Sequence, residues 1–304
     1  MTLKPPSDDP GTTPSFTGDT PLVNDVHPSP NHGDRKGRQP DAIILHHTAM
    51  VSGEAALLRL CDPAAEVSAH YLVWEDGRIS QLVAEKHRAW HAGQSYWAGE
   101  RDMNSVSIGI ELVHPGPEGG SPPYEEAQIA ATIALCLDIM RRRSIPAARV
   151  LGHCDIAPDR KDDPSAHFPW AQLAAAGVGL YVPPSPIVEG PRHQNGEHGQ
   201  HIETLQSLLA ILGYGLSITN LYGMKTEAVV RAFQRHYRPA LIDGIADVST
   251  IETLKALLAA RSAADKPQKV SSHPPEKAEK AEKPAKPQTA VSAETLAPKG
   301  RWLN

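Results

Sequence analysis

The stretch DAIILHHT, residues 41–48, is the part of the sequence that decides the fold. Its short apolar run, residues 41–45, has the length and composition of a buried strand. The run stops at His46 and His47, so two imidazole side chains stand where a strand ends. Side chains at strand ends and on loops can converge to form a site. We therefore expect a core strand here whose end contributes to chemistry.

The segments that follow this strand alternate between strand-like and helix-like patterns. Four further strands are expected, at residues 69–74, 79–83, 106–112 and 150–153. A hairpin turn at residues 75–78 joins the first two of them. Helices are expected over residues 53–60 and 125–142, and in the second the apolar side chains recur with helical spacing. This order predicts an α/β fold with a mixed central sheet flanked by helices.

Proline-rich stretches divide the chain, whose 304 residues are enough for two domains. Three amphipathic stretches after the α/β region, residues 202–212, 225–237 and 250–260, predict a small three-helix C-terminal domain. The predicted parts are a flexible N-terminal arm at 1–39, the α/β domain at 40–178, a linker at 179–197, the helical domain at 198–261 and a disordered tail at 262–304.

The composition excludes several classes of function. The net charge is −5 without a clustered basic excess, so we expect no nucleic-acid partner. No apolar run is long enough to span a bilayer, and residues 1–30 lack the apolar core of a secretory signal. The three cysteines cannot all pair and form no Cys-x-x-Cys motif, which argues against a disulfide scaffold. A reducing compartment is compatible with these features.

Three residues are candidates for a hydrolytic zinc site, which needs three protein ligands and one open position for water. His46 ends the first strand, His153 ends the last predicted strand, and Asp163 follows ten positions later, after a proline-containing loop. If the two strand ends are neighbours, these side chains come within bonding distance of one metal ion. From spacing alone, it remains possible that these two distant histidines and the aspartate occur by chance and share no metal site.

Four blocks of the sequence resemble, in the same order, a known family of enzymes. The blocks are ILHHTA (44–49), RAWHAG (88–93), SIGIEL (107–112) and GHCDIAPDRKDDP (152–164). Over roughly residues 38–178 the chain resembles the type-two N-acetylmuramoyl-L-alanine amidases, the AmpD-like enzymes, whose fold the peptidoglycan recognition proteins share. The resemblance implies a zinc-dependent hydrolase. Its substrate would be the amide between the lactyl group of N-acetylmuramic acid, or of its 1,6-anhydro form, and L-alanine in peptidoglycan or muropeptides.

The resemblance also implies roles for single residues. The zinc ligands would be His46, His153 and Asp163. Glu111 would be the general base that takes a proton from water, and Lys161 would stabilise the oxyanion. Judged without the resemblance, Glu111 is equally well an outward-facing strand carboxylate, and Lys161 a solvent-facing loop lysine.

Other residues near the predicted site are aromatic or histidine. Trp90, His91 and Trp97 are expected to line the substrate cleft, because aromatic rings cover the apolar faces of sugars and peptides. Trp90 is alternatively a core residue. His47 is expected to pack beside the site or to orient it by a hydrogen bond, and His70 is expected to be structural.

The C-terminal block has a resemblance of its own. With Leu-Gln at 205–206, Leu-Gly-Tyr at 212–214 and Phe-Gln at 233–234, it resembles the three-helix peptidoglycan-binding domain. A generic helical bundle is the alternative. If the block binds cell wall, it raises the effective concentration of substrate at the catalytic domain.

Three interpretations of function follow: a zinc amidase, a non-catalytic peptidoglycan recognition protein, or a phage-type lysin. Binding-only relatives commonly lack a zinc ligand, whereas all three candidate ligands are present here. The missing secretory signal favours a cytoplasmic enzyme acting on anhydro-muropeptides, while a wall-binding domain favours a periplasmic or cell-wall-associated one. We expect a monomer.

Overall fold

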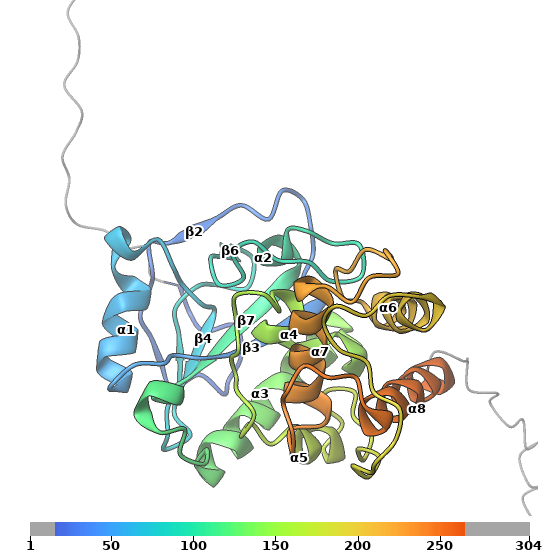
Figure 1. Cartoon of the computed structure of the whole chain (residues 1–304). Helices are drawn as coiled ribbons and strands as arrows, with labels where there is room; N and C mark the ends of the chain where they lie inside the picture. The colour runs from blue at the N-terminus through green and yellow to red at the C-terminus, as the bar shows by residue number, and fades with distance from the viewer. Residues whose placement is uncertain (1–15, 265–304) are drawn as a thin grey trace, which may run out of the picture. The chain divides into compact units, whose positions relative to one another are not determined.

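The computed structural model describes residues 16–264, and its centre is a six-stranded sheet (Figure 1). The strand order is β1-β5-β4-β7-β3-β8, and all neighbours are parallel except β4 and β5, which form the expected hairpin. The strands are β1 (Asp25–Val26), β3 (Ala42–His47), β4 (Tyr71–Val73), β5 (Ile79–Gln81), β7 (Ser107–Leu112) and β8 (Val150–Gly152). A separate antiparallel pair consists of β2 (His32–Gly33) and β6 (Arg88–Ala89). The predicted mixed α/β fold is confirmed.

The register of β3 brings distant parts of the chain to one edge of the sheet. β3 lies between β7 and β8, with His46 opposite Glu111 and Leu45 opposite Gly152. Because all three strands run in the same direction, the residues that end them meet at a common edge. His46, Glu111 and the segment that begins at His153 are therefore neighbours.

β3 is apolar from Ala42 to Leu45 because both faces of the sheet are covered. Ile43 and Leu45 pack in a cluster that includes side chains of α3 (Glu126–Arg143). Ile44 points to the opposite face and packs in a second cluster. A third, smaller cluster joins the sheet to α1 (Gly53–Cys61). Strands covered on both faces read as continuous apolar runs rather than alternating ones.

The remaining described helices are short or belong to the C-terminal region. Those of the α/β region are α2 (Met103–Val106), α4 (His153–Ile156) and α5 (Trp170–Ala175), with 3₁₀ turns at Pro63–Ala65, Pro117–Gly119 and Ala147–Arg149. The three predicted C-terminal helices are present as α6 (Gln200–Leu212), α7 (Met224–Tyr237) and α8 (Val248–Ala264). The cluster that contains Ile44 and Leu151 also contains Leu205 and Phe233, so the two regions share apolar core.

Residues 16–39 are more ordered than the expected extended arm. They contribute β1 and β2 and a buried arginine, Arg35, which donates hydrogen bonds to the carbonyls of Glu85, Ser105 and Ser107. Residues 1–15 and the tail beyond Ala264 lie outside the described residues. A second difference is α4, a helical turn where a loop was expected after β8.

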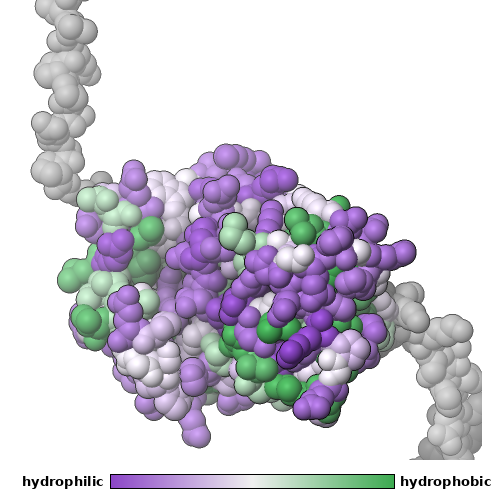
Figure 2. Space-filling view, viewed as in Figure 1, coloured by the Kyte–Doolittle hydropathy of each residue, from purple (hydrophilic) through white to green (hydrophobic). Residues whose placement is uncertain are grey.

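The viewed surface is mostly hydrophilic, with hydrophobic surface over α1 at the left of Figure 2. Val51 and Leu58, which precede and lie on that helix, are largely exposed. Within residues 16–264, no helix is both long and apolar enough to cross a membrane.

Candidate metal centre and active site

Three side chains converge at the common edge of β3, β7 and β8. Nδ1 of His46 lies 3.0 Å from Nδ1 of His153 and 3.0 Å from Oδ2 of Asp163, and the third side of this triangle is 3.1 Å. All three residues are buried. The loop that carries Asp163 is tied to α4 because the amide of Cys154 donates to the Asp163 carbonyl at 2.9 Å. The structure thus brings together the three residues selected from the sequence.

The hydrogen bonds of His153 determine which of its nitrogens carries a proton. Nε2 lies 3.2 Å from the carbonyl oxygen of Ala92, which can only accept a hydrogen bond. Nε2 is therefore protonated, and in a neutral imidazole Nδ1 is then bare. The lone pair of this Nδ1 points toward the other two donor atoms of the triangle.

A hydrogen-bonded chain of Ser107, His91 and His46 determines the proton positions of His46 in the same way. Ser107 donates its hydroxyl proton to the Met103 carbonyl, so its oxygen accepts from Nε2 of His91 at 3.3 Å. Nδ1 of His91 is then bare and accepts from Nε2 of His46 at 3.0 Å. Nδ1 of His46 is consequently bare as well.

Two bare imidazole nitrogens and a carboxylate oxygen at this separation repel one another unless a cation lies between them. Tetrahedral zinc, with bonds of about 2.0–2.1 Å, keeps its ligand atoms about 3.3 Å apart. The observed 3.0–3.1 Å sides are close to that value. The donor set and its geometry therefore fit a zinc ion with a position left for water.

Burial and charge adjust the ionisation of the ligands. Burial, reinforced by the neighbouring His153, lowers the pKa of His46 to about 4, so its imidazole is neutral at pH 7. Burial alone raises the pKa of Asp163, but the two adjacent imidazoles of His153 and His46 outweigh it and hold that pKa well below its usual range. A neutral imidazole and an ionised carboxylate are the forms that bind metal.

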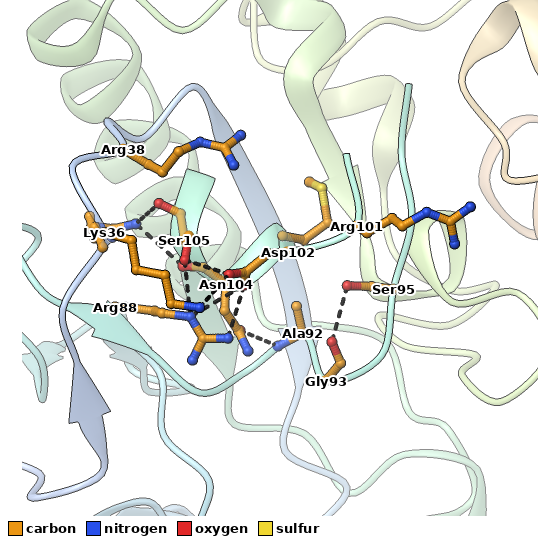
Figure 3. A network of polar contacts seen from close by, with 12 residues as sticks. Lys36, Arg38, Arg88, Ala92, Gly93, Ser95, Arg101, Asp102, Asn104 and Ser105 are labelled. Atoms are coloured by element: carbon orange, nitrogen blue, oxygen red, sulfur yellow. Dashed lines mark hydrogen bonds and ion pairs between the residues drawn. The ribbon is translucent and has the colours of Figure 1, made fainter. Parts of the chain in front are cut away.

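A polar network fixes the loop that follows β6, which carries His91 and Ala92 (Figure 3). Oδ1 of Asn104 accepts from the amides of His91 and Ala92 at 3.0 and 2.7 Å. Beside it, Asp102 accepts from Arg88 at 2.9 Å. On the opposite side, the Arg160 guanidinium donates to the Ala92 carbonyl, the same oxygen that receives the His153 proton. Asn104 and Arg160 hold the backbone beside the metal ligands in place, and neither role could be predicted from the sequence.

Gly109 explains how His91 reaches His46. A Cβ atom at Gly109 would lie 2.4 Å from Cγ of His91, a separation that packed atoms do not adopt. Gly109 stands two residues before Glu111 on β7, on the same face of the sheet. Only glycine at this point leaves room for the His91 ring.

Glu111 lines the pocket above the three ligands together with Lys161 and Trp90. Among the described residues, its buried Oε2 atom has no hydrogen-bond partner. Burial, with the Asp163 carboxylate adding to it, raises the pKa of Glu111 to about 8, and Lys161 acts in the opposite direction. The carboxyl group is thus free to exchange a proton with a molecule in the pocket.

The pocket has a volume of about 360 Å³. Lys161 is exposed and reaches its rim, and His47 and His91 also line it. The structure does not bring Trp97 to this pocket: the residue is 3% exposed, and its ring packs edge-on against Tyr214 with 4.9 Å between the ring centroids. His70 is buried away from the pocket lining, where Nδ1 accepts from the Gly109 amide at 2.9 Å, as a structural residue would.

A buried carboxylate links α4, the helical turn that carries His153, to the C-terminal region. Asp155, two residues after His153, is 0% exposed and accepts from the Gly152 amide at 2.8 Å. Tyr214 donates its hydroxyl to Oδ1 at 2.8 Å, and His236 donates Nδ1–H to Oδ2 at 2.7 Å. The C-terminal region therefore supports the helical turn that carries one of the ligands, His153.

Comparison with known proteins agrees with this geometry. A family model described as N-acetylmuramoyl-L-alanine amidase matches residues 36–166, and one described as putative peptidoglycan binding domain matches residues 198–254. N-acetylmuramoyl-L-alanine amidase AmiD of Escherichia coli (strain K12) is 38% identical over 223 residues, which are 68% of this chain and 78% of AmiD. The chain belongs to the N-acetylmuramoyl-L-alanine amidase family. The predicted enzyme class and both resemblances are confirmed.

The amidase also resembles other relatives. 1,6-anhydro-N-acetylmuramyl-L-alanine amidase AmpD of Escherichia coli (strain K12) is 36% identical over 165 residues, 48% of this chain and 87% of AmpD. AmiD in complex with anhydro-N-acetylmuramic acid-L-Ala-D-gamma-Glu-L-Lys has a TM-score of 0.63 at 37% identity, covering 75% of this chain and 90% of that one. AmpDh3 of Pseudomonas aeruginosa, in complex with anhydromuramic pentapeptide, has a TM-score of 0.61 at 30% identity, covering 82% and 98%.

Proposed function

We propose that this amidase binds zinc through His46, His153 and Asp163 and hydrolyses the amide between the lactyl group of N-acetylmuramic acid and L-alanine. The observation that carries the proposal is the triangle of two bare imidazole nitrogens and one carboxylate oxygen at the base of an open pocket. The substrate class is supported by the two related structures whose ligands are anhydromuramyl peptides. The proposed substrate therefore includes the 1,6-anhydro form of the sugar.

When zinc is bound, it supplies a Lewis acid that lowers the pKa of water from about 15.7 toward 7. Glu111 takes the proton from the attacking water, since its free oxygen faces the same pocket. A cation held by His46, His153 and Asp163 would favour the ionised form of Glu111 that this step needs. Glu111 then gives the proton to the amine of L-alanine as the amide bond breaks.

Lys161 has the charge and position to stabilise the oxyanion that forms at the amide carbonyl. Its ammonium group lines the pocket, and it is close enough to Glu111 to oppose the rise in that residue's pKa. Trp90 is half-buried at the pocket wall, where its ring offers an apolar surface to a sugar or peptide stem. His91 also lines the pocket, so we propose that its ring contacts substrate while its Nδ1 accepts the hydrogen bond from His46. Trp97 is not part of this proposal.

The C-terminal helices are proposed to bind peptidoglycan, which increases the encounter rate with wall-derived substrate. The cytoplasmic location expected from the sequence stays a prediction, and periplasmic or wall-associated activity is the alternative. Fractionation of cells that produce the tagged chain distinguishes the two. Recovery of the protein in the periplasm alone would show that the predicted cytoplasmic location is wrong.

The function is tested by digesting purified sacculi and anhydro-muropeptides with the full chain, with and without a chelator, and identifying products by mass spectrometry. Release of free peptides that begin with L-alanine, lost on chelation and restored by zinc, is the expected result. Binding to sacculi without any cleavage would instead identify a non-catalytic recognition protein. Cleavage between sugars, or activity that survives the chelator, would overturn the mechanism.

A further inference from the structure

A second group of metal-binding side chains lies outside the active site, where the linker meets the helical domain. His193, Glu197 and His201 each offer one donor atom, and these atoms all lie within 4.8 Å of one another. Oε2 of Glu197 is 3.1 Å from Nδ1 of His193 and 3.8 Å from Nε2 of His201. The two imidazole rings are 4.5 Å apart between centroids.

The backbone around these residues is held by the folded domain. His193 exchanges two backbone hydrogen bonds with Ala246, a buried residue, at 3.0 and 2.9 Å. The Glu197 carbonyl accepts from the amide of Tyr222 at 2.7 Å, and His201 lies in the first turn of α6. The three donors are therefore fixed on structured backbone and not on a free loop.

The donor set has the chemistry of a zinc site. Two imidazoles and one carboxylate are a combination that binds zinc with one position left for water. Ligand atoms around tetrahedral zinc are about 3.3 Å apart, and the two measured distances to Glu197 lie on either side of that value. The His201 side chain is about half exposed, so it has room to rotate toward Glu197.

We propose that His193, Glu197 and His201 form a second divalent-metal site, selective for zinc and similar imidazole-binding metals, that is structural and not catalytic. Its ligands come from the end of the linker and from the start of α6, so a bound ion connects these two segments. The ion would stabilise the folded helical domain, because metal that binds only the folded state shifts the unfolding equilibrium.

The test is the number of zinc ions that the full chain retains after dialysis against buffer of fixed free zinc, measured by elemental mass spectrometry. The natural chain is expected to hold one zinc ion more than the His193→Ala/His201→Ala variant. Glu197→Gln, which keeps the shape of the side chain, is expected to lose the same ion. His198→Ala is the matched control, because His198 is an exposed histidine of the same stretch outside the cluster.

A second measurement distinguishes this site from the active site. Asp163→Ala is expected to lose the active-site ion and keep the one at His193, and zinc is expected to raise the melting temperature of this variant. Adding the His193→Ala/His201→Ala pair to it should abolish that rise. Equal zinc content in the natural chain and the His193→Ala/His201→Ala variant would overturn the proposal, whatever the amidase activity of either.

Discussion

Replacing Gly109 with alanine is expected to weaken zinc binding although residue 109 touches no metal. The new Cβ would lie 2.4 Å from Cγ and 2.6 Å from Nδ1 of His91. Carbon atoms in contact are about 3.5–4.0 Å apart, so the ring must move by roughly 1 Å. The 3.0 Å hydrogen bond from His46 to His91 would then lengthen to about 4 Å, beyond hydrogen-bonding range.

The size of this effect follows from what His91 does for His46. Loss of a partner that orients a metal ligand typically costs about 10–100-fold in metal affinity or activity. We expect Gly109→Ala to lose zinc to a competing chelator at a correspondingly lower chelator concentration, with amidase activity falling in parallel. Gly33→Ala is the control, since a Cβ there meets only Nε1 of Trp90 at an ordinary 3.8 Å.

A double-mutant cycle tests the route of the effect. If the clash acts through the His91 ring, Gly109→Ala should cost little in a chain that already carries His91→Ala. The two single losses would then be far from additive. Natural zinc affinity in Gly109→Ala, or fully additive losses, would refute the reasoning.

Three further outcomes are expected. Glu111→Ala should keep its zinc and reduce turnover by about two to four orders of magnitude, checked by metal analysis and kinetics; a loss of zinc would contradict its role as base. Tyr214→Phe removes a hydrogen bond to buried Asp155 and should lower the free energy of unfolding by about 1–3 kcal/mol in urea titrations, and an unchanged midpoint would argue against this link. Burial raises the pKa of Glu85, but hydrogen bonds from Arg142 and others outweigh it and lower that pKa from 4.5 to about 2. The stability that this carboxylate contributes is therefore full above pH 4.5 and lost as pH falls toward 2. Glu85→Gln should cost about 3 kcal/mol at pH 7 and progressively less below pH 4, a trend that acid unfolding curves test directly.

The elements that could be predicted from the sequence are those with a strong local pattern. The apolar run before His46 and the helical spacing of residues 125–142 each identify an element within one or two residues of its observed bounds. Parallel pairing of neighbouring strands then explains why His46 and His153 meet. β1 and β2 escaped prediction because each has only two residues and lies among prolines, so neither carries a pattern.

The parts of the site that were missed depend on contacts between distant residues. Trp97 stands near the predicted cleft in the sequence, yet it packs against Tyr214, more than a hundred residues away. The hydrogen bonds of Asp155 to Tyr214 and His236 join two regions that have separate family resemblances. No local pattern pairs such residues, because each side chain taken alone suits many surroundings.

The apolar cluster also affects how the enzyme folds and unfolds. It contains Ile44 and Leu151 of the α/β region and Leu205 and Phe233 of the C-terminal region. If the side chains of one region leave this shared core, the apolar side chains of the other region become exposed to water. The two family regions are thus expected to melt in a single cooperative transition. A chain cut after residue 178 would present uncovered apolar surface on which copies can aggregate. Removing the C-terminal region of this amidase is therefore expected to reduce the solubility of the catalytic region, and not only its affinity for cell wall.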